Sequence, residues 1–425
     1  MMKSAPYWWE DAPLAALPAI ELPTRADTVI IGAGYTGLSA ALTLLRAGRS
    51  VIVIEAALAA EGASSRNGGM CGDLLKPSFT QLSARYGKQS AVALYSEVRD
   101  ALVFLQEVIA DNKIECDFAR VGRLTGALSQ QQLKGLESEA EILRKEIGTE
   151  YQIVSGPAIH DEIGSDLYVG ARILPHHGGL HPAKYAAALA RLVRECGGQI
   201  HEHTRLLRYE RTGQEFVLTT SRGKLRARDL IVATNGYTTS ATSWLRRRIV
   251  PVTSYMIATE EIPAATMRQL FPTGRMVTDT NRLLCYYRPS PDNKRILFGG
   301  RPAYTEIKPE QSAERLMQYL RRIFPVLYGT SVTHSWFGYI GYTFDHLPHL
   351  GKLDGAHYAA GYCGSGVVMA TWLGRKVAYR LLGNPEGQSA FAGIRHPTHI
   401  LYYGRPWFLP LVQAWYQLQD TSARR

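Results

Sequence analysis

Three glycines and one acidic residue have the types and spacing that bind a dinucleotide. The glycines are Gly32, Gly34 and Gly37, and Glu55 follows eighteen residues after the last of them. Gly32 permits a sharp turn from strand to helix, Gly34 lets the backbone approach a pyrophosphate, and Gly37 allows close packing of helix on strand. Glu55 is placed to accept hydrogen bonds from an adenosine ribose, and its charge disfavours NADP because it would repel a 2′-phosphate.

The local pattern around these residues supports this interpretation. A β-branched run at 29–31 predicts a buried strand, 38–47 predicts a helix, and 50–54 predicts the next buried parallel strand. The free N–H groups and positive dipole at the start of the helix suit a phosphate. The alternative is a glycine-rich turn that binds no ligand.

Two further segments contain small residues that could contact the same ligand. Segment 62–70 places paired glycines beside Arg66 and Asn67, where backbone N–H groups would face a flat, polar-edged ring; a plain loop is the alternative. Segment 233–236 ends a buried strand with small residues, which lets the backbone approach a nucleotide at the carboxyl edge of a sheet.

A second glycine turn lies about three hundred residues after the first. The strand at 358–360 leads into Gly364, Ser365 and Gly366, and a helix is predicted over 367–382. The dipole of this helix would stabilise the negative charge that a reduced flavin carries at N1 and O2. A nicotinamide gains no such charge on reduction, so the pattern favours FAD over NAD.

The bulk composition is that of an ordinary globular protein. The chain has 425 residues, of which 46% are hydrophobic and 20% charged, and this length predicts two or three domains. No apolar run is long enough to span a membrane and no signal peptide is seen, so we expect a cytoplasmic protein. Five scattered cysteines without a C-x-x-C pair fit a reducing compartment and argue against structural zinc.

No metal or nucleic-acid site is predicted. The pair His176-His177 precedes two glycines and is expected in a loop, with no acidic residue at metal-ligand spacing. The net charge of +11 comes from dispersed basic residues, of which 246–248 is the densest run, and no nucleic-acid-binding module accompanies them. A positive field would help to hold an anionic dinucleotide or an acidic substrate.

Sheet-type elements recur far from the first unit. We therefore expect an α/β protein in which a Rossmann-type FAD-binding domain is interleaved with an antiparallel-sheet substrate domain. The expected FAD-binding parts are 1–80, 165–243 and 340–385, the substrate-binding parts are 81–164 and 244–339, and an aromatic tail covers 386–425. Residues 1–26 are expected to form an arm packed on the body. Helices are predicted at 82–112, 130–147, 183–195 and 310–323, and strands at 201–209, 215–220, 223–228, 229–236, 255–259, 282–287, 295–299 and 331–338.

Over roughly residues 25–385 the chain resembles the D-amino-acid-oxidase-like FAD-dependent amine and amino-acid oxidoreductases. The resemblance rests on 32–37 with Glu55, on 62–69, on 233–236, and on Thr343-Phe344-Asp345 with Pro348 before the second glycine turn. The arm and Arg66-Asn67-Gly68-Gly69 look most like the γ-glutamylputrescine oxidase branch.

The resemblance implies that FAD lies extended, with adenosine at Glu55 and its ring between segment 66–70 and the second glycine turn. It implies that the α-hydrogen of a substrate amine leaves as hydride to flavin N5, giving an imine that water hydrolyses. The predicted cofactor-binding residues are Gly32, Gly34, Tyr35, Thr36, Gly37, Glu55, Ala56, Ser64, Ser65, Arg66, Asn67, Gly68, Gly69, Met70, Leu206, Ala233, Thr234, Asn235, Gly236, Gly338, Gly364, Ser365, Gly366 and Val367.

The sequence departs from the family at several functional positions. Where sarcosine oxidase relatives have a cysteine bonded to the flavin, this chain has Gly338, so a non-covalent FAD is expected. In relatives, arginines hold the carboxylate of the substrate. The corresponding positions in this chain are Ile340 and positions near Cys71 and Leu74, so these arginines are absent. Either the carboxylate of the substrate lies far from the reacting carbon, or another cation replaces them.

Four residues are candidates for the substrate side. Lys76 and Arg288 are candidate cations, although Lys76 could equally be an exposed residue without a function. Tyr255 could line the substrate pocket or simply pack into its sheet, and His346 could handle a proton or be an ordinary loop histidine.

The expected activity is oxidation of a C–N bond of an amine or amino acid, with O2 as acceptor and H2O2 as product. A dehydrogenase that passes electrons to a quinone or carrier is an alternative, as are a non-catalytic flavin-binding protein and an NAD dehydrogenase. The aromatic stretch 405–416 could cover the body of the protein, or it could form a peripheral membrane contact.

Overall fold

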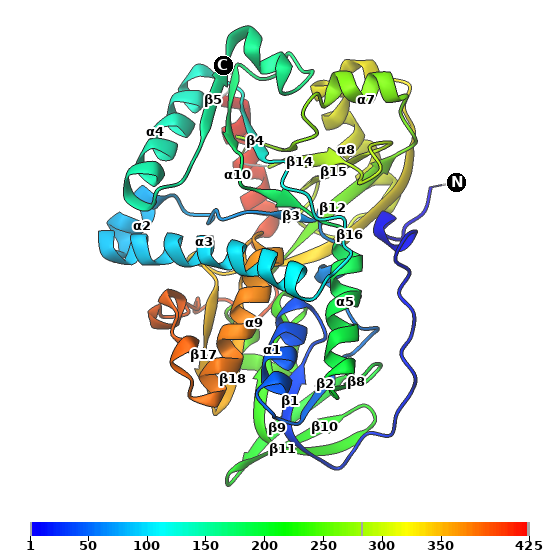
Figure 1. Cartoon of the computed structure of the whole chain (residues 1–425), viewed down its shortest axis with the longest axis vertical. Helices are drawn as coiled ribbons and strands as arrows, with labels where there is room; N and C mark the ends of the chain where they lie inside the picture. The colour runs from blue at the N-terminus through cyan, green and yellow to red at the C-terminus, as the bar shows by residue number, and fades with distance from the viewer. Residues whose placement is uncertain (1, 282–283, 423–425) are drawn as a thin grey trace.

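The computed structural model describes residues 2–281 and 284–422, with side chains up to residue 415. Its strands form two eight-stranded sheets and one short pair. Figure 1 shows the two large sheets one above the other, with helices packed around them.

The first sheet, in the lower half of Figure 1, is mainly parallel, as the dinucleotide pattern predicts. Its order is β17-β18-β11-β1-β2-β8, with only the β17–β18 pair antiparallel, and a hairpin of β9 and β10 extends from β11. The strands are β1 (Arg25–Ile31), β2 (Val51–Ile54), β8 (Gln199–His201), β9 (Leu206–Thr212), β10 (Glu215–Thr220), β11 (Gly223–Val232), β17 (His349–Leu353) and β18 (Ala356–Ala360).

Both faces of this sheet are covered, which explains why its central strands are continuous apolar runs. One apolar core, to which Ile30, Val51 and Val53 belong, packs against α1 (Tyr35–Arg46), α3 (Lys88–Asp111), α5 (Pro182–Glu195) and α9 (Gly366–Leu382). A separate core on the other face contains Ile31 and Ile52 and packs against the β9–β10 hairpin and the segment around α6 (Ser243–Arg246).

The second sheet is almost entirely antiparallel. Its order is β16-β12-β15-β14-β13-β4-β6-β5, and only β13 and β4 run parallel. Its own apolar core lies against α7 (Ala264–Leu270) and α8 (Pro309–Ile323), while α4 (Gln130–Ile147) covers β4 and β6. The strands are β4 (Arg123–Ala127), β5 (Gln152–Ser155), β6 (Gly170–Leu174), β12 (Val250–Thr259), β13 (Met276–Asp279), β14 (Tyr286–Pro289), β15 (Ile296–Gly300) and β16 (Val332–Tyr342).

The chain crosses between the sheets several times, so the predicted α/β architecture with interleaved sheets is confirmed. One expected boundary differs from the observed pairing. β6 lies inside the stretch 165–243 that was assigned to the FAD-binding part, yet it is hydrogen-bonded between β4 and β5 of the second sheet. The first sheet resumes only at β8, after α5.

Two predicted elements differ in extent. The helix predicted at 82–112 is two helices, α2 (Phe79–Tyr86) and α3, because Gly87 adopts φ +84°, a backbone conformation that ends a helix. The strands predicted at 223–228 and 229–236 are one long strand, β11, whose first half pairs with β10 and whose second half pairs with β1 and β18. The start of the strand predicted at 282–287 lies outside the described residues.

The N-terminal arm packs on the body through its aromatic residues. Trp8 is fully buried and its indole N–H donates to the carbonyl of Asn67 at 2.8 Å, while the indole N–H of Trp9 donates to Ser65 Oγ at 3.1 Å. The arm therefore holds segment 62–70, which the sequence assigned to the cofactor.

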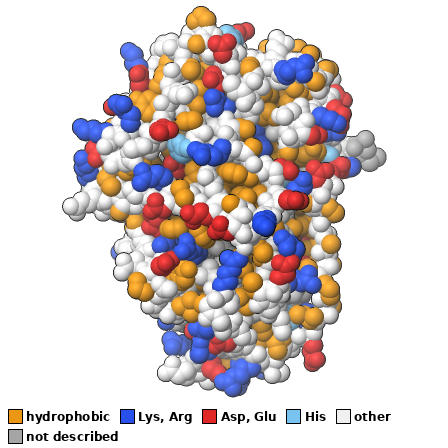
Figure 2. Space-filling view, viewed as in Figure 1, with side chains coloured by type: hydrophobic (Ala, Val, Ile, Leu, Met, Phe, Trp, Pro, Cys, Tyr) orange, Lys and Arg blue, Asp and Glu red, His pale blue; other side chains and the backbone are white. Residues whose placement is uncertain are grey.

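At the other end, α10 (Leu409–Ser422) follows a long irregular segment and packs beside the second sheet (Figure 1). Among the described residues, no helix is both long and apolar enough to cross a membrane. Figure 2 shows basic and acidic side chains interspersed over the face in view.

Candidate functional site

A cavity of about 580 Å³ lies between the two sheets, a size typical of cofactor and substrate pockets. From the first sheet and its turns it is lined by Gly32, Gly34, Glu55, Ala233, Thr234 and Asn235. From the second sheet it is lined by Arg123, Ser254, Thr278, Tyr286, Phe337 and Gly338. A ligand in this cavity would therefore touch both halves of the molecule.

The nucleotide end is built by the first glycine turn. A Cβ on Gly37 would lie 1.9 Å from the carbonyl oxygen of Gly32, so only glycine lets α1 approach β1 this closely. Gly32 itself has φ +104°, which favours glycine. Gly34 precedes α1 and has no side chain to cap it, and Ser64 Oγ accepts from the N–H of Tyr35 at 3.0 Å. The start of the helix lines the cavity, so its dipole suits a phosphate there.

Glu55 closes this end of the cavity. Its carboxylate accepts hydrogen bonds from the backbone N–H groups of Ala33 at 2.8 Å and Ala57 at 3.1 Å. Burial raises the pKa of this carboxyl, and the two backbone donors oppose that shift. Each oxygen keeps a further lone pair for a donor, so the residue fits a ribose diol.

Segment 62–70 is held rigidly beside the cavity. The side-chain amide of Asn67 donates to the carbonyls of Ala63 and Ser64 and accepts from the N–H of Gly69 at 2.8 Å. The indole N–H of Trp336 donates to the carbonyl of Arg66 at 2.9 Å. These bonds fix a polar backbone surface of the kind that a planar ring system can lie against.

The second glycine turn lines the same cavity as the first. Gly364, Ser365, Gly366 and Val367 are all lining residues. Ser365 caps α9 without a side-chain hydrogen bond to the helix, and its hydroxyl donates instead to the carbonyl of Leu74 at 3.0 Å. Two helix starts, about three hundred residues apart in the chain, therefore line one cavity, as a site for a dinucleotide with a redox-active ring requires.

These features fit FAD. Glu55 suits its ribose, the start of α1 its pyrophosphate, and the start of α9 the charge of its reduced ring. Of the predicted cofactor-binding residues, all but four line the cavity. The four others lie next to it: Gly37 and Gly69 permit close backbone packing, Ser65 donates to the carbonyl of Ala60, and Gly236 lies against β16.

The four candidate substrate-side residues lie outside the lining that the described residues form. Lys76 and His346 are exposed. Tyr255 is buried in the second sheet, where its hydroxyl donates to the carbonyl of Thr305 and accepts from the N–H of Ile307. Arg288 is buried and donates to the carbonyl of Leu180 at 3.1 Å, so its guanidinium is directed to backbone beside segment 62–70.

Three arginines that the sequence did not single out line the cavity, namely Arg205 beside the first sheet, and Arg123 and Arg301 from the second sheet. Arg301 follows β15 and donates to the hydroxyl of Tyr342 at 2.5 Å. Arg123 is the first residue of β4, which is separated from β15 by β14 and β13 in the same sheet. No motif marks either position, because each is brought to the cavity only by the pairing of strands distant in sequence. Alternation along β4 predicts that Arg123 and Thr125 lie on the same face of the sheet, but it does not predict which face that is.

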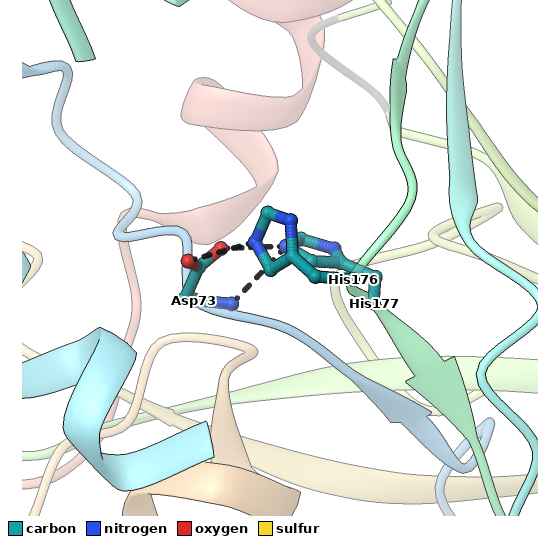
Figure 3. A group of neighbouring side chains, drawn as sticks. All are labelled: Asp73, His176 and His177. Carbon is teal, nitrogen blue, oxygen red and sulfur yellow. Dashed lines mark hydrogen bonds and ion pairs between the residues drawn. The ribbon is translucent and has the colours of Figure 1, made fainter. Parts of the chain in front are cut away.

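Arg123 is held by a buried chain of polar side chains. Its Nε–H donates to His177 Nδ1 at 2.9 Å, and His177 Nε2 lies 2.6 Å from a carboxylate oxygen of Asp73. His176 Nε2 lies 2.9 Å from the other oxygen of Asp73 (Figure 3). Burial lowers the pKa of Arg123 to about 10, with Asp73 acting in the opposite direction, so the guanidinium remains charged near neutral pH.

The expectation that no acidic residue accompanies the two histidines is therefore corrected. Asp73 is distant in sequence but meets both, and the three could hold a metal ion by distance alone. The hydrogen bonds indicate a different role. Arg123 donates to His177 Nδ1, and His177 Nε2 lies 2.6 Å from the carboxylate and 3.3 Å from the backbone N–H of Asp73, so both ring nitrogens of His177 already have partners within the protein. Burial, followed by the charge of Arg123, lowers the pKa of His177 to about 3, so the ring is neutral.

Comparison with known proteins agrees with this site. The family of FAD-dependent oxidoreductases (DAO) matches residues 27–380, and the chain belongs to it. The chain is 34% identical to gamma-glutamylputrescine oxidoreductase of Escherichia coli K12, over 87% of each chain. It is 32% identical to a probable oxidoreductase, OrdL, of Haemophilus influenzae, over 91% of this chain and 90% of the relative.

Solved structures show the same fold. Glycine oxidase from Geobacillus kaustophilus superimposes with a TM-score of 0.74 at 22% identity, covering 89% of this chain and all of the other. L-proline dehydrogenase from P. horikoshii gives 0.71 at 20% identity, covering 87% and 96%. The protein is thus an FAD-dependent oxidoreductase, and the predicted family and cofactor are confirmed.

Proposed function

We propose that this protein oxidises a C–N bond of a small amine or amino acid that carries an anionic group, with non-covalently bound FAD. The observation that carries the proposal is the single cavity that both helix starts and Arg123 line. Relatives named gamma-glutamylputrescine oxidoreductase and glycine oxidase support an amine or amino-acid substrate.

FAD supplies the acceptor for the hydride that leaves the α-carbon. The protein positions the amine against the cofactor and excludes water, so no obligatory acid–base pair is needed. This agrees with the position of His346, which is exposed and lies outside the cavity lining. Arg288 has a supporting role, since it fixes backbone beside segment 62–70.

Arg123 is the proposed anchor for the anionic group of the substrate. Its Nε–H is used by His177, and its two terminal nitrogens make no hydrogen bond to any other residue that the structure describes. A guanidinium with both terminal N–H₂ groups available binds a carboxylate well. Asp73 stabilises the buried charge through His177 without occupying the groups that would contact the substrate.

The acceptor of the electrons has two candidates, O2 with release of H2O2, or a quinone or carrier protein. We favour O2, in a cytoplasmic enzyme. Flavin reoxidation in air, with one H2O2 formed per amine consumed, would establish the oxidase. Reoxidation only by an added quinone would establish the dehydrogenase.

Anaerobic mixing of the purified yellow protein with amines tests the activity itself. We expect amines with a distant carboxylate to bleach the flavin absorbance and to yield an aldehyde or keto product. If polyamine derivatives, N-methylated amino acids and cyclic imino acids all leave the flavin oxidised, the protein is a non-catalytic flavin binder.

A further inference from the structure

An exposed apolar surface near the C-terminus has no role in the proposed chemistry. Large side chains in the segment 400–415 are exposed to solvent by more than half of their area: Ile400, Leu401, Tyr403, Trp407, Leu411 and Trp415. We call these six residues the tail patch. Soluble proteins rarely expose so many large apolar side chains within one short segment, and such patches mark interaction sites.

The inner side of the same segment is already fixed to the body. Leu409 is buried in a cluster with Tyr402, and the side chain of Gln413 accepts from the N–H of Tyr304 at 3.1 Å. Leu411 and Trp415 are four residues apart on α10, so they share a face, and it is the solvent face. A surface helix normally turns its apolar side inward, so the outward apolar face here needs another partner.

The surroundings of the tail patch are basic. The side chain of Arg246 lies against Gly404, and the guanidinium of Arg247 lies 4.5 Å from the centre of the Tyr403 ring. Arg405 within the segment and Arg395 just before it are also exposed. The sequence contains no Asp or Glu from 387 to 419, nor from 230 to 259 around the arginine run.

From this combination we infer that the tail patch binds the surface of a membrane that contains anionic lipids. Trp and Tyr favour the headgroup region, Leu and Ile enter the edge of the acyl layer, and the arginines pair with lipid phosphates. A second copy of the chain fits less well. A symmetric contact would bring the same arginines together, and segments 387–419 and 230–259 contain no Asp or Glu that could pair with them.

The surface also lies close to the redox site. Gln413 of α10 donates to the carbonyl of Pro302 at 3.3 Å, and the neighbouring residue Arg301 lines the cavity. The helix that carries the tail patch is therefore fixed, on its inner side, to a segment next to the cavity. The inference concerns attachment and does not depend on which amine is oxidised.

Co-sedimentation of the FAD-loaded protein with lipid vesicles tests the inference. We expect binding to vesicles that contain phosphatidylglycerol, much weaker binding to pure phosphatidylcholine, and loss of binding as salt is raised. The double variant Arg247→Glu, Arg405→Glu should lower the affinity at least about tenfold. The double variant Trp407→Ser, Trp415→Ser should lower it by at least about fivefold.

Control positions outside the tail patch lie on α3 and α5, two helices that cover one face of the first sheet. Val103 on α3 and Arg191 on α5 are exposed, so Val103→Ser and Arg191→Glu remove apolar area and charge without touching the tail patch. Flavin absorbance and melting temperature verify that each variant is folded. Absence of wild-type binding to anionic vesicles, or equal loss in the control and tail variants, would overturn the inference. So would a dimer in sedimentation velocity that only the tail variants dissociate.

Discussion

Arg123 illustrates how a half-buried charged residue can line a cavity without being neutralised. The guanidinium is charged, Asp73 is the nearby carboxylate, and a neutral His177 separates them by one imidazole ring. A direct ion pair would use the terminal nitrogens of the arginine. Through the interposed neutral histidine, the carboxylate of Asp73 compensates the charge of Arg123 while the terminal nitrogens of the arginine stay available for a ligand.

Substitution of Arg123 should therefore change substrate affinity selectively. We expect Arg123→Gln to raise KM for a carboxylate-bearing amine by about 10- to 100-fold, because hydrogen bonds to charged groups contribute about 1.5–3 kcal/mol. The amide derivative of the same amine should show little change. Steady-state kinetics with both substrates measures the difference.

Arg172 offers the control for this experiment. It is also buried, and it lies near Asp73 and Glu139, but it is not among the described residues that line the cavity. Arg172→Gln should lower stability without separating the two substrates. If Arg123→Gln raises KM equally for the carboxylate-bearing amine and for its amide derivative, Arg123 is not the anchor of the carboxylate.

A buried histidine pair predicts acid sensitivity. His396 stacks on His349 at 4.1 Å, and both of its ring nitrogens are buried without a hydrogen-bond partner among the described residues. Burial, followed by the charge of His349, lowers the pKa of His396 to about 2. The unfolded chain binds this proton near pH 6.5, so the stability that the neutral ring confers is complete above pH 6.5 and is lost as pH falls towards 2.

We expect His396→Phe to keep the stacking and to flatten the fall of the melting temperature below pH 6.5. The free energy concerned is about 2 kcal/mol between pH 7 and pH 5. Melting curves measured across this range test it. His203 is exposed in a turn at φ +52°, where Asn is tolerated, so His203→Asn is the control and should leave the pH profile unchanged.

At the scale of elements, the first glycine turn needs glycine mainly because α1 packs so close to β1, rather than because the backbone there must be flexible. α1 approaches β1 so nearly that Gly37 has no room for a methyl group. Segment 62–70 is likewise fixed from outside itself, by Trp8 of the arm and Trp336 of β16. The cofactor surface is thus assembled from several elements, none of which could form it alone.

Gly37→Ala should push α1 away from β1 and cost about 2 kcal/mol or more, with loss of bound FAD. Gly135 lies in α4 with open space around its Cα, so Gly135→Ala should instead stabilise the protein by about 0.5–1 kcal/mol. Flavin absorbance per protein and melting temperature compare the two. Full FAD content in Gly37→Ala would contradict the packing described above.

At the scale of the whole molecule, the cavity lies where the two sheets meet. Each sheet has its own apolar core, and the cavity is lined by residues from both. FAD is therefore expected to stabilise the junction as well as to react.

Removal of FAD should lower the melting temperature and separate the unfolding of the two sheets. A ligand present at a thousand times its dissociation constant contributes about 4 kcal/mol to stability. Calorimetry of the apoprotein should show a broader or double transition that re-added FAD restores to one. A single, unshifted transition in the apoprotein would show that the sheets unfold together without the cofactor.

Most residues predicted for the cofactor end line the cavity, because that end consists of local signals. A strand, a glycine turn and a helix start are contiguous, and their residues are constrained by backbone geometry that does not depend on distant partners. The substrate end could not be read in this way. Lys76, Tyr255, Arg288 and His346 were chosen by residue type and by nearness to motifs. By contrast, Arg123 at the start of β4 and Arg301 just after β15 carry no motif.

The sequence by itself thus determined the parallel α/β unit, the FAD cofactor and the two helix starts that face it. Only the tertiary structure decided that Asp73 meets His177, that Arg123 and Arg301 line the cavity while Arg288 binds backbone, and that the tail patch stays exposed. The physical reason is the range of the interactions. Turns and caps are satisfied within a few residues, but the direction of a side chain on an antiparallel strand depends on partners more than a hundred residues away.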